Sequence, residues 1–228
     1  MGIKKEVIIG DCRLLLGDCM EIMPLLDKVD AAVTDPPYGY KDFNITRTGG
    51  SWSKKYQRDN SITDWDFKPE QGCFDLIFKK SEVAIIWGGN YFTEHLKNNR
   101  GFLIWHKKTI SESFSMAMAE YAWTNINMNA KVYHSPPQDS GRKHPTQKPL
   151  ALMQWCLTHL PKETVTILDP FMGSGTTLVA CAKMGRKGIG IEKDEDYFNI
   201  ACKRVQEAYN SPDMFIEPPK KAPQEKFI

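Results

Sequence analysis

The stretch from 164 to 192 constrains the fold more than any other part of the chain. It begins with an apolar run that ends in Asp169, continues through the glycine loop "PFMGSG" and a helix-like segment, and closes with a second apolar run that ends in Glu192. Glycines allow a backbone to approach a ligand closely, and an acid at the end of the second run can accept hydrogen bonds from both ribose hydroxyls. The pattern predicts a β-α-β nucleotide-binding unit.

Two other interpretations of this stretch stay open on the residues alone. One is a tight turn followed by a surface glutamate with no ligand. The other is a dinucleotide dehydrogenase, although the third glycine of that fingerprint is missing and Leu178 stands in its place. A loop that opens with Asp-Pro-Phe also suits a ligand that carries an amine better than it suits a pyrophosphate.

Short apolar runs alternate with amphipathic stretches along the rest of the chain. This alternation predicts an α/β fold with a mostly parallel central sheet and helices on both faces. Strands are expected at 12–17, 29–35, 82–89, 101–108, 164–169 and 187–192, helices at 19–26, 70–80, 90–99, 150–160, 176–185 and 195–209, and a hairpin or further edge strands at 119–126 and 130–134.

Length and composition favour one domain in a reducing compartment. With 228 residues, 41% of them hydrophobic, the chain can bury one core, and we expect a single domain over 1–210. The six cysteines show no C-x-x-C spacing, which favours free thiols in the cytoplasm. No segment approaches the length and apolarity of a membrane span. The formal net charge of +2 is too small to indicate nucleic acid by itself.

Three segments depart from the alternating pattern. Residues 39–68 are polar, basic and aromatic, and predict a mobile loop that could clamp DNA or simply be solvated. Residues 109–143 predict a small insertion that could recognise the target, and 211–228 predict a disordered tail. Basic residues that could contact DNA or merely face solvent are Lys54, Lys55 and Arg58 beside Trp52 and Tyr56, together with Lys107, Lys108, Arg142 and Lys143.

The segment "VTDPPYGY" ends a strand abruptly. Proline has no N–H to donate to a sheet, so the strand stops at Asp35 and a stiff turn follows. An exocyclic amine on a nucleobase is a poor nucleophile until acceptors draw on its hydrogens. The Asp35 carboxylate and the Pro36 carbonyl, held by Pro37, are suited to that task, and Tyr38 could stack on a base taken out of the duplex. The plain alternative is a rigid turn without chemistry. In a parallel sheet, the strand ends at Asp35 and Asp169 would share one carboxyl edge.

These motifs resemble those of the amino-group DNA methyltransferases that use S-adenosylmethionine. "DPPY" (35–38) resembles their catalytic motif, "DPFMGSGTT" (169–177) their cofactor loop, and "HPTQKP" (144–149) the segment that wraps the methionine end of the cofactor. The catalytic motif precedes the cofactor loop, as in the permuted β-type order of that family. The resemblance implies a Rossmann-like fold, no metal, and a cofactor site made of Asp18, His144, Pro145, Thr146, Lys148, Asp169, Pro170, Phe171, Gly173, Ser174, Gly175, Thr176, Thr177 and Glu192.

The resemblance also implies an activity. It predicts methyl transfer from S-adenosylmethionine to N6 of adenine in double-stranded DNA, because the family links an Asp at the first motif position mostly to adenine. N4 of cytosine, an RNA base and an inactive nucleic-acid-binding relative are the alternatives. A bacterial or phage origin and a restriction-modification context follow from the same resemblance. A homodimer is expected because the insertion at 109–143 leaves little room for target recognition, and no membrane partner is expected because the chain has no apolar span. A covalent nucleophile is not expected, since no Cys follows a Pro in the chain.

Overall fold

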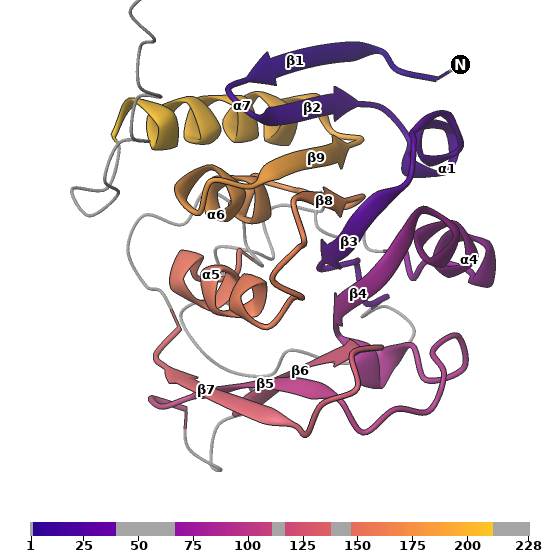
Figure 1. Cartoon of the computed structure of the whole chain (residues 1–228), viewed down its shortest axis with the longest axis vertical. Coiled ribbons are helices and arrows are strands. Elements are labelled where there is room, and N and C mark those ends of the chain that lie inside the picture. The colour runs from indigo at the N-terminus through magenta and orange to yellow at the C-terminus, as the bar shows by residue number, and fades with distance from the viewer. Residues whose placement is uncertain (1, 40–66, 111–116, 138–146, 212–228) are drawn as a thin grey trace, which may run out of the picture.

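The structure is a computed structural model that describes residues 2–39, 67–110, 117–137 and 147–211 (Figure 1). Within these residues, nine strands form one sheet in the order β1-β2-β9-β8-β3-β4-β6-β5-β7. The strands are β1 (Lys5–Ile9), β2 (Cys12–Leu16), β3 (Val29–Thr34), β4 (Ser81–Trp87), β5 (Phe102–Lys107), β6 (Ala119–Thr124), β7 (Lys131–Ser135), β8 (Thr166–Asp169) and β9 (Lys187–Glu192). The helices are α1 (Cys19–Ile22), α4 (Gln71–Lys80), α5 (Leu150–Thr158), α6 (Thr176–Lys183) and α7 (Glu195–Asn210), with 3-10 turns η1 (Met23–Leu25) and η3 (Gly89–Tyr91).

The centre of the sheet is parallel, as the sequence pattern predicts. β2, β9, β8, β3 and β4 are neighbours in that order, and each pair of neighbours is parallel. β1 is antiparallel to β2 at one edge. A parallel sheet places the carboxyl ends of its strands along one edge, and that edge is where open α/β sheets bind ligands.

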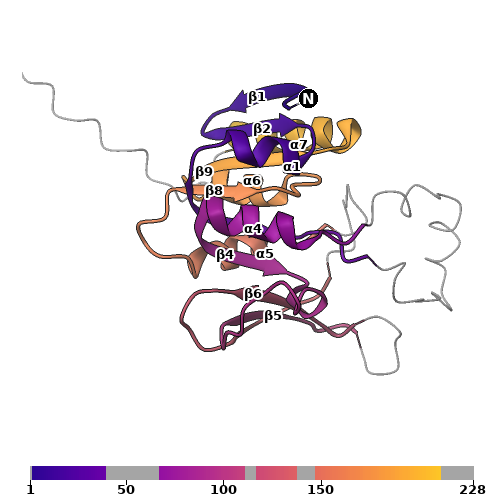
Figure 2. The same cartoon turned by 90° about the vertical axis from the view of Figure 1, so that its right-hand side faces the viewer.

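Helices cover both faces of the sheet (Figures 1 and 2). α5, α6 and α7 pack on one face, where Leu152, Leu178 and Phe198 are fully buried. α1 and α4 pack on the other face around buried Ile22 and Phe74. Adjacent residues of one strand therefore enter different cores, which explains why these strands are continuous apolar runs rather than alternating ones.

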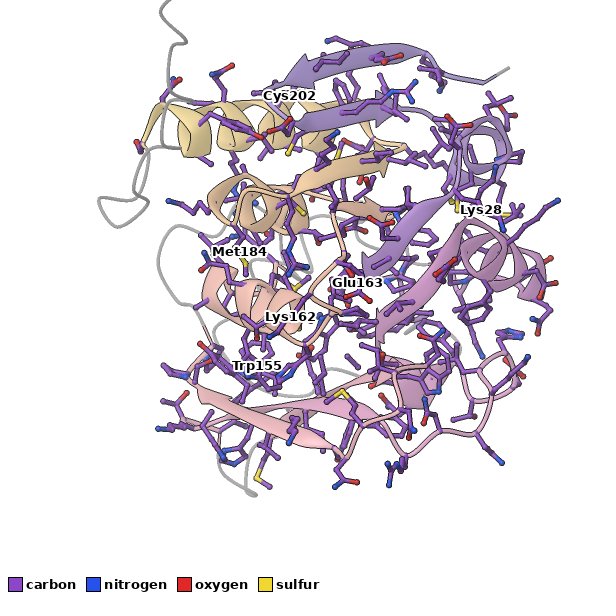
Figure 3. The ribbon with its side chains drawn as sticks, viewed as in Figure 1. Lys28, Trp155, Lys162, Glu163, Met184 and Cys202 are labelled. Atoms are coloured by element: carbon purple, nitrogen blue, oxygen red, sulfur yellow. The ribbon has the colours of Figure 1, made fainter. Side chains whose placement is uncertain are left out.

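The mixed part of the sheet differs from the sequence prediction. β6 and β7 do not form a hairpin: β6 lies between β4 and β5 and is antiparallel to both, while β7 pairs in parallel with β5. Of these two strands, β7 alone lies at the edge of the sheet. Its Tyr133 packs on Trp155 of α5, with ring centroids 5.2 Å apart, and the labelled Trp155 is seen beside β7 in Figure 3. The inward placement of β6 brings its polar residues close to the strand edge described below.

One further element prediction is wrong, and one strand has no counterpart in the prediction. The expected helix at 90–99 is only the turn η3 and one further hydrogen-bonded turn from Phe92 to Leu96, because the end of the segment binds β6. Asn99 Nδ2 donates to the Thr124 carbonyl at 2.5 Å, and Trp123 Nε1 donates to the Lys97 carbonyl at 2.8 Å. The sequence pattern also gives no sign of β1. The six cysteines are free thiols, as predicted. In the described part of the chain, no helix is long and apolar enough to span a membrane.

Candidate active site

Four acids lie along one edge of the sheet. β2, β9, β8 and β3 are consecutive parallel neighbours, and Asp18, Glu192, Asp169 and Asp35 lie at or just beyond their carboxyl ends. The order of these strands in the sheet differs from their order along the chain, so acids from distant segments become neighbours. The glycine loop follows β8 and the catalytic motif follows β3, which places the two predicted motifs side by side at this edge.

Asp169 joins the two motifs from inside the protein. Its Oδ1 accepts hydrogen bonds from Thr34 Oγ1 at 2.7 Å and from the Phe171 N–H at 3.1 Å, and its Oδ2 accepts one from Thr177 Oγ1 at 2.6 Å. Burial raises the pKa of Asp169 to about 6, although these three donors act in the opposite direction. Asp169 therefore ties β3, the loop and α6 together. Sequence reasoning did not identify Thr34 as its partner.

The glycine loop has a backbone that side chains would disturb. Gly173 and Gly175 have φ angles of 52° and 79°, in the left-handed region that favours glycine. A Cβ on Gly175 would lie 2.9 Å from the Cβ of Ala201 in α7. From the same helix, Arg204 Nη1 donates to the Ser174 carbonyl at 2.5 Å and to Ser174 Oγ at 2.8 Å. Arg204, which no sequence motif singles out, thus fastens the loop to α7.

Glu192 binds the glycine loop as well as its own turn. Its Oε2 accepts a hydrogen bond from the Gly173 N–H at 2.9 Å, and its Oε1 accepts one each from the N–H groups of Lys193 and Asp194, both at 2.8 Å. Burial raises the pKa of Glu192 more than these bonds lower it. At the next strand, Asp18 caps α1 by accepting a hydrogen bond from the Met20 N–H at 2.8 Å.

Both carboxylate oxygens of Asp35, in the catalytic motif, accept hydrogen bonds. Asp35 Oδ1 accepts a hydrogen bond from the Tyr38 hydroxyl at 2.5 Å, and Asp35 Oδ2 lies 2.5 Å from Lys148 Nζ. The Tyr38 ring is buried and stacks on Tyr91 with centroids 4.9 Å apart. The structure therefore places Tyr38 as a hydrogen-bond donor to Asp35, and the expected stacking platform for a base is not open in this arrangement.

The comparisons with known proteins agree with this geometry. A family model described as a DNA methylase, for N6 and N4 methyltransferases, matches residues 76–203. The chain belongs to the N6/N4 DNA methylase family.

Relatives and solved structures extend the match beyond the family model. Type II methyltransferase M.HpaI of Haemophilus parainfluenzae is 23% identical over 253 residues, which cover 94% of this chain and 81% of the relative. The crystal structure of the M1.HpyAVI-SAM complex is 25% identical, with a TM-score of 0.58, and covers 85% of this methylase and 98% of that chain. PvuII DNA methyltransferase, cytosine-N4-specific, has a TM-score of 0.58 at 13% identity and shows the shared fold, covering 92% and 95% of the two chains. This DNA methyltransferase is thus Rossmann-like, as predicted.

Lys148 contacts the catalytic motif in the structure, and its predicted role in cofactor binding stays a prediction. As part of "HPTQKP" it was expected to hold the cofactor, but its ammonium contacts the catalytic motif, and the described contact from this segment to the glycine loop comes from Gln147, whose Oε1 lies 3.2 Å from Ser174 Oγ. Lys107, predicted as a surface phosphate contact, is buried and forms an ion pair with Glu120. Lys108 is exposed, as a phosphate contact would require.

Several predicted residues lie outside the described part of the methylase. These are the cofactor residues His144, Pro145 and Thr146, the basic pair Arg142 and Lys143, and the clamp residues Trp52, Lys54, Lys55, Tyr56 and Arg58. They stay predictions.

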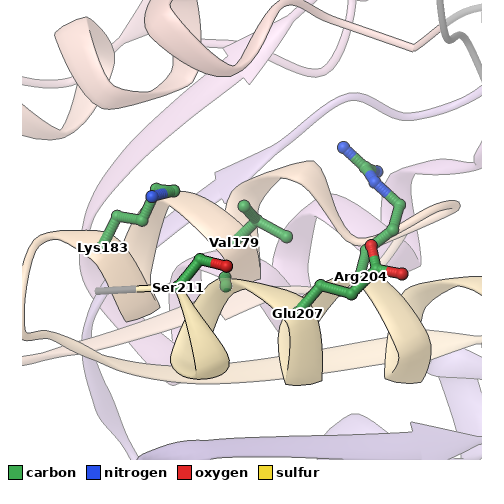
Figure 4. Close-up of a pocket in the computed structure, with 6 residues that line it drawn as sticks. Val179, Lys183, Arg204, Glu207 and Ser211 are labelled. Atoms are coloured by element: carbon green, nitrogen blue, oxygen red, sulfur yellow. The ribbon is translucent and has the colours of Figure 1, made fainter. Parts of the chain in front are cut away.

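A surface pocket of about 230 Å³ lies between α6 and α7 (Figure 4). Its lining residues are Val179, Lys183, Arg204, Glu207, Ala208 and Ser211. It borders the helices that hold the glycine loop and takes no residue from the four acids at the strand edge. We therefore place the active site at the strand edge and assign this pocket no ligand.

Proposed function

We propose that this methyltransferase transfers the methyl group of S-adenosylmethionine to N6 of adenine in double-stranded DNA. The observation that carries the proposal is that Asp35 and the glycine loop follow neighbouring strands, β3 and β8, at one edge of the sheet. This arrangement suits a reaction that brings a nucleotide-like cofactor and an amine into contact.

The residues at the strand edge fit the cofactor. Asp18 and Glu192, at the ends of adjacent strands, are carboxylate acceptors suited to the hydroxyl and amino groups of an adenosine. The backbone of Gly173 and Gly175 permits close approach, and Arg204 keeps the loop in place. When bound there, S-adenosylmethionine supplies an already activated, cationic methyl group, so the protein's task is positioning and hydrogen bonding. The remaining cofactor residues predicted from the sequence belong to this proposal unchanged.

Activation of the amine falls to the catalytic motif. The lone pair of an exocyclic amine is delocalised into the base until its N–H groups find acceptors. Asp35 and the carbonyl of Pro36 each accept one N–H in this proposal, and the rigid Pro37 fixes the angle between them. Such hydrogen bonds strengthen as positive charge develops on nitrogen, which favours the transition state over the ground state. The base must first leave the duplex stack.

Adenine is preferred to cytosine because of Asp35. The family resemblance links an acid at this motif position mostly to adenine, but the fold is shared with a cytosine-N4-specific enzyme, and the same two acceptors would serve either amine. The test is to treat unmethylated genomic DNA with protein and cofactor, digest it to nucleosides, and identify them by mass spectrometry. N4-methylcytosine without N6-methyladenine would refute the choice of base, and no methylated nucleoside at all would refute the proposed activity.

We propose that the DNA sequence recognised by this protein is short. The described strands from Lys5 to Glu192 form one sheet, and the described helices pack on its two faces, which supports the proposed single domain over 1–210. The insertion at 109–143 is small for a separate reading domain. We expect a short or degenerate site, read with the help of a second subunit. Modification-aware sequencing of the treated DNA that revealed a long asymmetric site would contradict this, and light scattering with and without DNA tests the homodimer.

A further inference from the structure

A buried ammonium next to the catalytic carboxylate has contacts that its predicted cofactor role does not explain. The side chain of Lys148 is only 6% exposed. Its Nζ lies 2.5 Å from Asp35 Oδ2, 3.1 Å from Glu120 Oε2 and 3.2 Å from the Tyr38 hydroxyl. It also lies 5.6 Å and 5.5 Å from the ring centroids of Tyr38 and Trp87, close enough for cation–π attraction. Lys148 is therefore held between two carboxylates and two aromatic rings.

The second carboxylate is less firmly held than the first, because the buried Oε2 of Glu120 has an ion-pair partner in Lys148 but no hydrogen-bond partner among the described residues. Glu120 lies on β6, opposite Trp105 in the register with β5, and it forms an ion pair with Lys107 of β5. Burial acts to raise the pKa of Glu120, but Lys148 and Lys107 outweigh burial and hold that pKa at about 2. Glu120 is therefore ionised at neutral pH, and it offers Lys148 an alternative partner.

Four side chains form a charge-balanced row: Asp35, Lys148, Glu120 and Lys107. They come from four different elements, namely the end of β3, the segment before α5, β6 and β5. Besides Tyr38, the described titratable groups close to the row include Asp169 and Cys156. Asp169 is near enough to Asp35 for the negative charge of Asp35 to raise the pKa of Asp169. The thiol of buried Cys156 lies near Lys148, and burial raises the pKa of that thiol, so Cys156 contributes no charge at neutral pH.

We propose that Lys148 is a positioning residue that keeps the buried Asp35 ionised and passes to Glu120 when the target amine binds Asp35. This inference rests on the proposed amine methylation. Asp35 Oδ1 already accepts a bond from Tyr38, so an incoming N–H competes with Lys148 for Oδ2. Because Lys148 lies within 3.1 Å of Glu120, it can strengthen that contact without becoming exposed. No covalent bond changes in this exchange.

Removal of the Lys148 charge and removal of the Glu120 charge should shift the pKa of Asp35 in opposite directions. Burial raises the pKa of Asp35, Lys148 lowers it and Glu120 raises it. Without Lys148, the buried carboxylates of Asp35 and Glu120 have only Lys107 as a positive partner. Their mutual repulsion then raises the pKa of Asp35, which takes up a proton. Without Glu120, Asp35 is the only carboxylate of the row left to bind Lys148, and the target amine competes less well. Without both, Asp35 and Lys107 leave the row neutral again.

The experiment compares Lys148→Met, Glu120→Gln and the double variant, with exposed Lys131→Met of β7 as control. The primary readout is the Asp35 pKa from ¹³C-carboxyl NMR titration, assigned with Asp35→Asn. We expect Lys148→Met to raise it by about one unit or more, Glu120→Gln to lower it, and the double variant to return toward wild type. The pH profile of kcat should move with the Asp35 pKa, KM for DNA should rise in Glu120→Gln, and the Kd for S-adenosylmethionine should change by less than about threefold throughout.

Three outcomes would overturn the inference. A tenfold loss of cofactor affinity in Lys148→Met with an unmoved pH profile would return Lys148 to the cofactor role predicted from the sequence. A loss of kcat in the double variant equal to the product of the two single-variant losses would show that the two residues are not coupled. If Lys148→Met does not fold, an unchanged Asp35 pKa in Glu120→Gln decides against the proposal. The titration of Asp35 needs no DNA. Wild-type protein that methylates no base would therefore refute the proposed function, but it would not change the pKa values that the titration measures.

Discussion

The Glu192→Ala substitution tests whether the end of β9 is a cofactor-binding position. The Glu192 carboxylate accepts three backbone N–H groups, from Gly173, Lys193 and Asp194. In the alanine variant, water can reach the exposed Lys193 and Asp194, but the half-buried Gly173 N–H loses its partner. An unsatisfied N–H of this kind costs about 1–3 kcal/mol of unfolding free energy. For a chain of this size, that corresponds to roughly 2–12 °C in Tm.

The Glu192→Ala variant should also bind S-adenosylmethionine more weakly, and by more than disorder of the glycine loop alone would cause. Removal of a charged hydrogen-bond acceptor for ribose costs about 1.5–3 kcal/mol, or roughly a 10- to 150-fold increase in Kd. Titration calorimetry with S-adenosylmethionine measures Kd, and thermal unfolding measures stability. Glu192→Gln is not a neutral replacement, because its amide NH₂ must face either the Gly173 N–H or the N–H groups of Lys193 and Asp194.

Asp30→Ala provides the matched control. Asp30 Oδ2 accepts the N–H groups of Val165 at 2.8 Å and Thr166 at 2.7 Å, so it too is a carboxylate that binds backbone. It lies at the start of β3, at the opposite edge of the sheet from the active site. Its loss should lower stability and leave the Kd for S-adenosylmethionine unchanged. Unaltered cofactor affinity in Glu192→Ala, or an equal loss in Asp30→Ala, would refute the assignment of Glu192.

Three further changes have expected outcomes. Asp35→Asn should abolish turnover and leave the Kd for S-adenosylmethionine within several-fold of wild type; calorimetry that found a loss as large as that in Glu192→Ala would contradict the separation of roles. Burial raises the pKa of Asp169 from 3.8 to about 6, so the folded state binds this proton more tightly than the unfolded state. The resulting stabilisation, about 3 kcal/mol, is fully present below pH 3.8 and is lost as pH rises through about 6. Denaturant unfolding between these pH values should show a weaker pH dependence in Asp169→Asn, and an unchanged slope would show that another group is responsible. Joint replacement of Lys54, Lys55 and Arg58 by alanine should weaken DNA binding and flatten its salt dependence, measured by fluorescence anisotropy at several salt concentrations; equal binding at every salt concentration would mean that the segment does not contact DNA.

The parts of the fold that the sequence predicted are those with local causes. The strand ending at Asp169, the loop with Gly173 and Gly175, and α6 follow from short-range chemistry: an apolar run of strand length, glycines at positions with positive φ, and a helical period. The stop after Asp35 follows from two prolines. Because Asp35 and Asp169 each end a strand, a parallel sheet brings them to one edge, and this placement needs no knowledge of the packing.

What only the tertiary structure decided depends on pairing between distant segments. Whether β6 pairs with β7 or enters the sheet between β4 and β5 is a competition among partners that no local pattern reports. That choice brings Glu120 to Lys148, and it turns a predicted edge residue and a predicted cofactor residue into neighbours of Asp35. A buried charge requires a partner, but the sequence does not say which of many opposite charges lies within reach, because that distance is set by the packing of the whole sheet.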